Sequence, residues 1–244
     1  KPSTGFIFGS QSDIRHEAAR RGWLTLFPEF NEQFTQVVDK QLDVQANFEL
    51  LPDLTIDLNG NRLYSESTSE NYLIENGVYH SLTPNTFGNF NISTILFGSS
   101  FKSSGLHQPH AFQDFKDNRI IVANRLAEEY YGTTNFPVDE DGYPVGFGKT
   151  SQDVLLPSFL AAYRGRSASK EKTSFLRNIP LPNWDVKYTG LMRLEWFKQN
   201  FNRFSIHHGY RAAYTINQFQ TNLDYDMNNP EATTQNGNFK SKTL

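Results

Sequence analysis

The chain has 244 residues, a net charge of −3 and no cysteine. This length suits one large domain or two small ones, and these residues offer no disulfide, cysteine nucleophile or thiolate metal site. Acidic and basic residues are interspersed, which argues against a nucleic-acid-binding surface. Aromatic residues make up 14% of the chain and hydrophobic residues only 37%, a balance that is typical of outer-membrane β-strands.

Neither end of the chain looks like a natural terminus, so we expect a section of a longer protein. No apolar run reaches the length of a transmembrane helix. Residues 1–34 are expected to form a loop and short-helix connection, with the helix ending before Gly22. Residues 35–101 are then expected to be strands of a β-barrel.

The first two of these strands alternate between apolar and polar residues over 36–64, with a turn at Leu51-Pro52-Asp53. Because successive strand side chains point to opposite faces, this hairpin has one apolar and one polar face. The apolar members are Val38, Leu42, Val44, Ala46, Phe48, Leu50, Leu54, Ile56 and Leu58. The polar members are Asp39, Gln41, Asp43, Gln45, Asn47, Glu49, Asp53, Thr55, Asp57 and Asn59. Lys40 is the one charged residue on the apolar parity.

Residues 65–88 are rich in Ser, Asn, Thr and Glu, and their composition predicts a loop. A third strand is expected over 89–101. Residues 102–180 are expected to form a helical insertion or loop. Helical spacing predicts a helix over 112–131 that stops at Gly132. A capping-box pattern at 150–153 opens a second helix up to Arg164, although Pro157 favours a start at Leu156. Residues 167–172 are polar and are expected to be mobile.

Alternation returns over 181–220, which predicts two more barrel strands, one from Asn183 and one over 203–219. Their apolar members are Trp184, Val186, Tyr188, Phe204, Ile206, Tyr210 and Tyr214. Their polar members are Asp185, Lys187, Arg203, Ser205, His207 and Arg211. Residues 221–244 are expected to form a polar loop or tail.

Alternating strands occur in soluble β-sandwiches and in outer-membrane barrels. Three features favour the barrel: the strands reach the 9 to 11 residues that span a bilayer, their polar faces are strongly polar, and aromatic residues lie near their ends. We therefore predict that the apolar members face lipid and the polar members face a water-filled lumen. Five strands are too few to close a barrel, so the chain would be one sector of a larger wall.

No motif in the chain supports an enzyme. His207 and His208 are neighbours on a strand and point to opposite faces. The acidic run 139–142 lacks the closing glutamate of a calcium loop, and 146–150 lacks the first glycine of a phosphate loop. We expect no catalytic residue, metal site or cofactor.

Four segments are similar to a known family: residues 9–25, Leu54-Thr-Ile-Asp-Leu-Asn59, Leu181-Pro-Asn-Trp-Asp-Val-Lys-Tyr-Thr-Gly190 and Phe204-Ser-Ile-His-His-Gly-Tyr-Arg211. They resemble the SprA (Sov) family, the giant outer-membrane translocon of Bacteroidetes, over about residues 5–225. The chain looks like an internal section of such a protein.

The resemblance implies a very large transmembrane β-barrel in the cell outer membrane, part of the type IX secretion system that exports folded proteins and supports gliding motility. It implies as partners a PorV-type outer-membrane shuttle protein, a periplasmic plug protein and secreted cargo proteins. Residues 102–180 would act as a gate, a cap or a lumen insertion. Two alternatives remain open: the barrel of a TonB-dependent transporter, and a soluble β-sandwich binding module.

Overall fold

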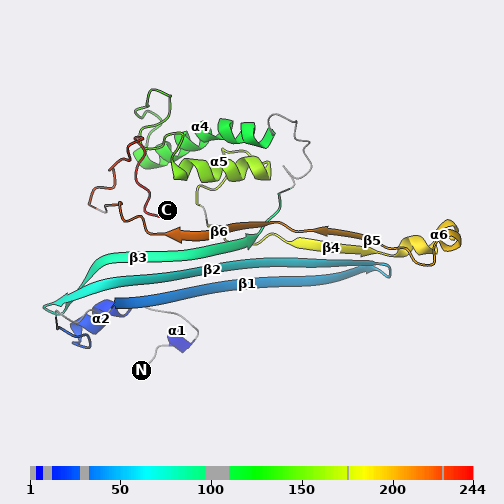
Figure 1. Ribbon diagram of the computed structural model, residues 1–244, viewed down its shortest axis with the longest axis horizontal. Helices are drawn as coiled ribbons and strands as arrows, with labels where there is room; N and C mark the ends of the chain where they lie inside the picture. Colours follow the sequence, from blue (N-terminus) through cyan, green and yellow to red (C-terminus); the bar gives the residue numbers. More distant parts are fainter. Residues whose placement is uncertain are drawn as a thin grey trace. The chain divides into compact units, whose positions relative to one another are not determined.

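A computed structural model describes residues 4–7, 13–27, 33–96, 110–174, 176–226 and 228–243. Its strands are β1 (Gln33–Leu51), β2 (Leu54–Glu75), β3 (Val78–Ser93), β4 (Asn183–Tyr188), β5 (Ile206–Tyr210) and β6 (Ala213–Gln220). They form one antiparallel sheet, which does not close into a barrel (Figure 1). The prediction of a mainly β chain with antiparallel strands is confirmed.

The helices are α1 (Thr4–Ile7), α2 (Arg15–Arg20), α4 (His110–Tyr131), α5 (Gln152–Arg164) and α6 (Glu195–Asn200), with a 3₁₀ turn η1 (Gly190–Arg193). The chain divides into two compact units. The first unit comprises residues 1–38 and 66–87, and the second comprises residues 39–65 and 88–244. Strands β1, β2 and β3 therefore contribute residues to both units.

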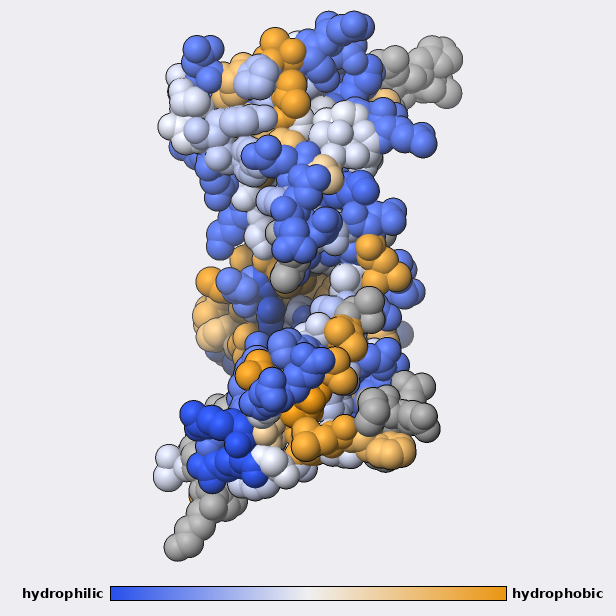
Figure 2. Space-filling view, turned by 90° about the vertical axis from the view of Figure 1, so that its left-hand side faces the viewer, coloured by the Kyte–Doolittle hydropathy of each residue, from blue (hydrophilic) through white to orange (hydrophobic). Residues whose placement is uncertain are grey.

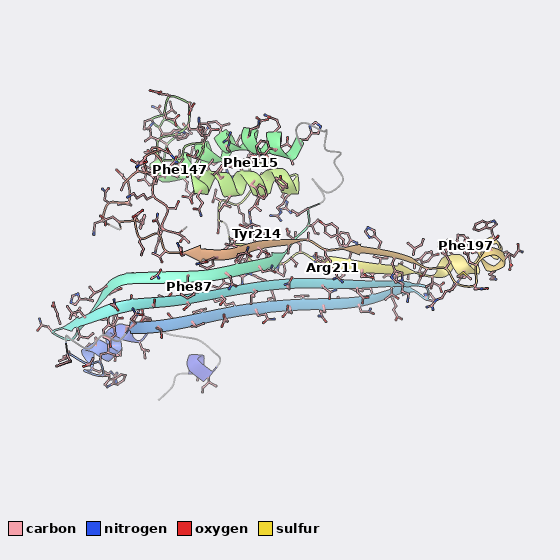
Figure 3. The ribbon with its side chains drawn as sticks, viewed as in Figure 1. Phe87, Phe115, Phe147, Phe197, Arg211 and Tyr214 are labelled. Carbon is pink, nitrogen blue, oxygen red and sulfur yellow. The ribbon has the colours of Figure 1, made fainter. Side chains whose placement is uncertain are left out.

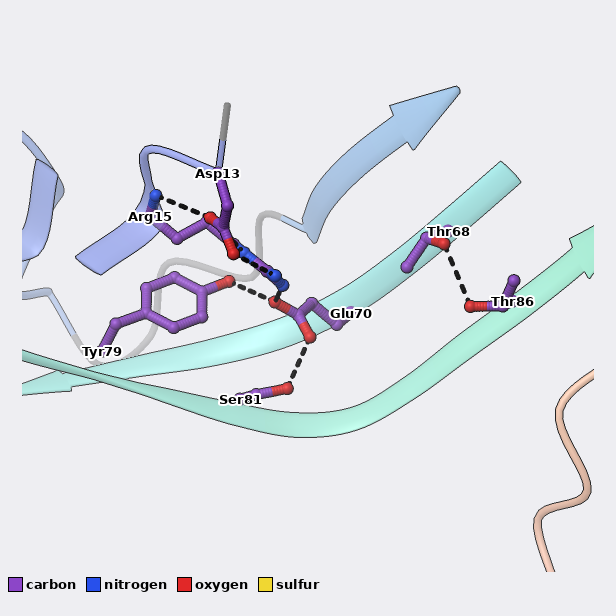
Figure 4. Close-up of polar contacts among 7 residues, drawn as sticks. All are labelled: Asp13, Arg15, Thr68, Glu70, Tyr79, Ser81 and Thr86. Carbon is purple, nitrogen blue, oxygen red and sulfur yellow. Dashed lines mark hydrogen bonds and ion pairs between the residues drawn. The ribbon is translucent and has the colours of Figure 1, made fainter. Parts of the chain in front are cut away.

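The first unit contains a β-hairpin where we had predicted a loop over 65–88. Strand β2 continues to Glu75 and β3 begins at Val78, so only Asn76 and Gly77 form the turn. Both have positive φ, 51° and 75°, as a type I′ turn requires. The loop prediction was wrong because the polar residues pair across the strands, as Thr68 and Thr86 do with hydroxyls 3.0 Å apart (Figure 4).

A buried carboxylate ties the N-terminal segment to this hairpin (Figure 4). Glu70 forms an ion pair with Arg15 and accepts hydrogen bonds from the hydroxyls of Tyr79 and Ser81. Arg15 also donates to Asp13 over 2.6 Å. The Glu70 side chain is only 2% exposed, so these donors supply the solvation that burial removes.

In the second unit, β3 and β4 continue one another along the same edge of β2. β4 pairs with the first residues of β2, from Leu54↔Tyr188 to Asn59↔Asn183. β1 also pairs with β2, directly after the hairpin turn, and it lies on the opposite edge because β4 already pairs with the first residues of β2 on this one. β3 pairs with the later part of β2. The chain thus enters its insertion after Ser93 and returns at Asn183, in the middle of what would otherwise be one strand. The expected third strand over 89–101 ends at Ser93, and residues 97–101 lie outside the described residues.

The last predicted strand, 203–219, is divided into β5 and β6 at Arg211 and Ala212. Ala212 lies beside the gap between β3 and β4. Its N–H donates to the side-chain oxygen of Asn183 over 2.9 Å, and its carbonyl accepts from Thr94 N over 3.0 Å. The ladder breaks here because the neighbouring strand is itself interrupted.

The insertion is built on α4 and α5, which pack through small side chains. Val122 of α4 meets Ala161 of α5, and Ala123 and Ala127 meet Val154. The predicted helices are confirmed, with Gly132 following the first at φ 66°. The second begins at Gln152 rather than Leu156, so Pro157 is inside it, and Ser151 makes no side-chain cap bond.

Candidate membrane-facing sheet

The sheet of the second unit has two faces of different chemistry, and strand register decides which side chains share a face. Directly paired antiparallel residues lie on the same face. The predicted lipid-facing residues pair with one another: Leu54 with Tyr188, Ile56 with Val186, Leu58 with Trp184, Trp184 with Tyr210, and Tyr188 with Ile206. The predicted lumen-facing residues also pair with one another: Thr55 with Lys187, Asp57 with Asp185, and Lys187 with His207.

The apolar face is uncovered along β1. Leu42, Val44, Phe48 and Leu50 are 45%, 51%, 45% and 63% exposed. Together with the half-buried Ala46 they occupy alternate positions of one strand, so they form a continuous stripe rather than scattered exposed residues. Figure 2, a view from one end of the molecule, shows hydrophobic residues (orange) at the surface among hydrophilic ones (blue).

The polar face carries hydrogen bonds between side chains of neighbouring strands. Asn47 Nδ2 on β1 donates to Asp57 Oδ1 on β2 over 2.6 Å. Further along, Asn61 donates to Asn91, which donates to Thr215 over 2.6 Å. These rows connect β2, β3 and β6 through polar groups that also remain open to water.

Aromatic residues organise the apolar face of β4 and β5. Trp184 and Tyr210 stack with ring centroids 4.5 Å apart. Trp184 Nε1 also donates to His208 Nδ1 over 3.2 Å. This hydrogen bond gives the imidazole a polar partner on the apolar parity.

Lys40, the other polar exception, has a similar explanation. Its Nζ lies 5.9 Å from the ring centroid of Tyr64 on the adjacent strand. Arg62 lies over the rings of Tyr64 and Phe90 at 6.0 and 5.4 Å. The aromatic faces attract these cations and so accommodate charge among apolar side chains.

Part of the apolar face is covered by the chain's own insertion. Phe90, Ile92 and Phe219 are buried, and the partly buried Tyr64, Leu176, Tyr214 and Ile216 pack against them. Leu176 comes from the segment that follows α5, and the adjacent Arg177 accepts a hydrogen bond at its carbonyl from Arg62. Tyr214 therefore contacts protein side chains on its face of the sheet.

The residues just outside strands have no face fixed by strand alternation. Arg203, Phe204 and Ser205 precede β5, and Arg211 lies between β5 and β6 (Figure 3). Phe204 joins an aromatic cluster at α6 with Phe197 and Phe201, at centroid distances of 5.0 and 5.3 Å. Trp196 of the same cluster is 61% exposed.

Sequence reasoning missed the burial within 167–172, which it treated as a mobile polar segment. Ala168 and Glu171 are both 2% exposed. Arg125 Nη1 donates to the carbonyls of Ala168 and Glu171 over 2.6 and 2.8 Å. The available signal was the density of Arg and Lys between 164 and 177, which needs nearby acceptors.

Among the described residues, no three His, Asp or Glu side chains gather as a metal site would require. No described helix is long and apolar enough to cross a membrane. The stretch 139–142 forms a turn in which Asp139 Oδ1 accepts from the backbone N–H groups of Asp141 and Tyr143.

Comparison with known proteins yielded no match to a family model and no similar curated protein.

Proposed function

We propose that this chain is a sector of the wall of a wide outer-membrane β-barrel that conducts folded proteins to the cell surface, as in type IX secretion. Export through this pore would support gliding motility. In this proposal the apolar stripe of β1 faces lipid and the polar rows face the pore. A PorV-type shuttle, a periplasmic plug and the cargo proteins are its proposed partners.

One observation carries the proposal: the β1–β2 hairpin is long and two-faced, and the apolar stripe of β1 is uncovered. Its strands have 19 and 22 residues, more than the 9 to 11 that span a bilayer. The exposed stripe from Leu42 to Leu50 needs an apolar environment that the described residues do not provide.

The open edge of the sheet supports a larger assembly. Among the described strands, β1 pairs only with β2, so no described strand satisfies the backbone groups on its outer edge. In a bilayer these groups require a further strand, since lipid offers no hydrogen bonds. The neighbouring part of the proposed wall would supply that strand beside β1.

A soluble binding module is the second candidate, and the covered patch around Phe90 favours it. There the apolar face packs on the insertion as it would in a soluble α+β protein. In that case the stripe on β1 would be covered by protein instead of lipid.

Neighbouring positions on β1 distinguish these candidates. The chain has no cysteine, so Val44→Cys and Gln45→Cys each introduce the one thiol of its sequence, and labelling is measured against the unsubstituted protein. In outer membranes that contain the intact protein, we expect a water-soluble maleimide to label the Gln45 variant at least about tenfold faster. A bimane label on the Val44 variant should be quenched by brominated lipid. Equal labelling, or no quenching at position 44, would show that this face does not meet lipid.

Export of protein is tested separately. Deleting residues 39–65 from the intact protein should abolish the surface appearance of folded cargo. Loss of nutrient uptake with normal protein export would instead identify a transporter of the TonB-dependent kind.

A further inference from the structure

A cavity of about 480 Å³ lies within the second unit, between the sheet and the insertion. The sheet contributes the end of β3 and the start of β6, including Ile92, Ser93 and Tyr214. The insertion contributes α5 and the segment after it, up to Leu181. The volume is within the usual range of small-ligand sites.

Cationic side chains dominate the charged part of the cavity. Its lining includes Arg164, Arg166, Lys170, Lys172 and Arg177. Glu171 is the one acidic residue of that lining. The formal charge around the cavity is therefore strongly positive, with only one carboxylate to balance five cations.

That carboxylate is shared by two guanidinium groups. Glu171 Oε1 lies 2.6 Å from Arg177 Nη2 and 3.4 Å from Arg164 Nη1. Both arginine side chains are only 11% exposed. Burial lowers the pKa of Arg164, and the nearby positive charges of Arg166 and Arg177 add to this effect, while Glu171 opposes it. Among the described residues, one carboxylate thus balances two buried guanidinium groups, which leaves one positive charge in excess.

Three residues at the cavity carry buried donors that make no hydrogen bond with any described residue: Arg164 at Nε, Arg177 at Nε and Nη2, and Tyr214 at its hydroxyl. Glu171 Oε2 is a buried acceptor without such a bond at the same place, and Arg177 Nη2 contacts Glu171 only as an ion pair. All three residues line the cavity, and Figure 3 shows Tyr214 on β6, the strand below the insertion. Unpaired buried polar atoms are costly, and the donors on these three residues outnumber the single acceptor of Glu171, so the set indicates a ligand that accepts hydrogen bonds.

The donors come from three different residues on two sides of the cavity. A tetrahedral phosphate presents three terminal oxygens in three directions, whereas a planar carboxylate presents two. Guanidinium groups suit such oxygens because they are planar and always charged. The arrangement therefore favours a phosphate over a carboxylate.

The rest of the wall is apolar. Leu96, Phe159, Leu160, Ile179 and Leu181 line the cavity beside the cationic groups. A free phosphate would leave this surface without a partner. Apolar side chains next to a cationic centre match a molecule with an anionic head and a hydrocarbon part.

We propose that this cavity binds an anionic amphiphile, a phosphate group carried on a hydrocarbon chain, with Arg164, Arg177 and Tyr214 around the phosphate. This proposal goes beyond the proposed role in secretion and does not depend on it, because it rests only on the residues that line the cavity.

The test uses the whole chain, purified in an uncharged maltoside detergent, and isothermal titration with three probes. These are dihexanoyl phosphatidic acid, dihexanoyl phosphatidylcholine and inorganic phosphate. We expect saturable binding of the phosphatidic acid, at least about tenfold tighter than either other probe. Equal binding of the phosphatidylcholine would overturn the requirement for an exposed anionic phosphate. Equal binding of inorganic phosphate would overturn the amphiphile and identify a free-phosphate site.

Variants locate the site. Tyr214→Phe keeps the ring and removes only the unpaired hydroxyl, so the fold should persist while phosphatidic acid binds about tenfold more weakly. Arg164→Gln should reduce binding about a hundredfold. Tyr143→Phe, a tyrosine outside the cavity, is the matched control and should bind as the parent does. No binding by the parent chain, or unchanged binding by Tyr214→Phe, would overturn the proposal.

Discussion

Ser93 and Leu181 are joined by two hydrogen bonds at the point where the insertion leaves and rejoins the sheet. Leu181 N donates to Ser93 O over 3.0 Å, and Ser93 Oγ donates to Leu181 O over 2.8 Å. Ser93 Oγ also accepts from Asn61 N over 3.1 Å. One hydroxyl thus replaces the ladder bonds that the interrupted strand does not provide.

This relationship predicts that Ser93→Ala destabilises the chain. Ser93 is 1% exposed, so the variant leaves the Asn61 N–H and the Leu181 carbonyl without this partner in a buried setting. We expect the free energy of unfolding to fall by about 1–3 kcal/mol. Thermal unfolding in detergent measures it, with Ser69→Ala on β2 as control. Equal effects of the two variants would contradict a special role for Ser93.

Glu70→Gln should destabilise the first unit. The ion pair with Arg15 would be lost, and two hydroxyls would face a neutral amide in place of a buried carboxylate. Because Arg15 is about a quarter exposed, we expect a loss of about 2–3 kcal/mol, below that of a fully buried pair. Glu75→Gln, an exposed position at the end of β2, should change stability by less than about 0.5 kcal/mol. Faster backbone hydrogen exchange over 13–24 in Glu70→Gln, but not in Glu75→Gln, would confirm that Glu70 holds the N-terminal segment on the hairpin.

The stability of this N-terminal segment, which Arg15 and Asp13 help to hold, should depend on pH below about 4. The Arg15 guanidinium hydrogen-bonds Asp13 and lowers the pKa of that carboxyl from 3.8 to about 2. A lowered pKa stabilises the folded state above the unfolded value, and this contribution is lost as pH falls from about 4 to about 2. Asp13 is largely exposed, so the amplitude should stay below about 1 kcal/mol. Hydrogen exchange over 13–24 in Asp13→Asn should vary less across this range than in the parent; an identical pH profile would refute the assignment.

Gly146→Ala should loosen the contact between the insertion and the C-terminal segment. Gly146 has φ 86°, and an added Cβ would lie 2.2 Å from a ring carbon of Phe239. Gly142 has φ 79° and open space around the same position, which makes it a matched control for backbone strain. We expect Gly142→Ala to cost about 1–2 kcal/mol and Gly146→Ala to cost about 1–3 kcal/mol more. Similar melting temperatures for the two variants would rule out the steric contact.

Under the proposed function, lysine should be tolerated on one face of β1 only. Val44→Lys puts a charge on the proposed lipid side, at a cost of about 2–4 kcal/mol near the bilayer midplane. Gln45→Lys puts the same charge on the proposed lumen side and should have little effect. The amount of folded protein in isolated outer membranes measures the difference. Equal amounts of both variants would argue against lipid on the Val44 side.

The sequence alone was enough to predict the strands and helices whose signals are local. A period of two placed the apolar and polar sets of β1, β2, β4 and β5 on opposite parities, helical spacing predicted α4, and a capping-box pattern predicted α5. The hairpin at Asn76 and Gly77 was missed although its two residues are a strong local turn signal, because the polar composition around them was given more weight.

Only the tertiary structure decided where each face is covered and which polar residues are buried. The partners of Glu70 lie up to 55 residues away in the chain, and those of Ser93 up to 88. Alternation assigns a side chain to a face of its strand but says nothing of what packs on that face. For this reason the sequence assigns the stripe on β1 and Tyr214 to the same apolar face. The fold leaves the stripe uncovered and places Tyr214 beside a cationic cavity.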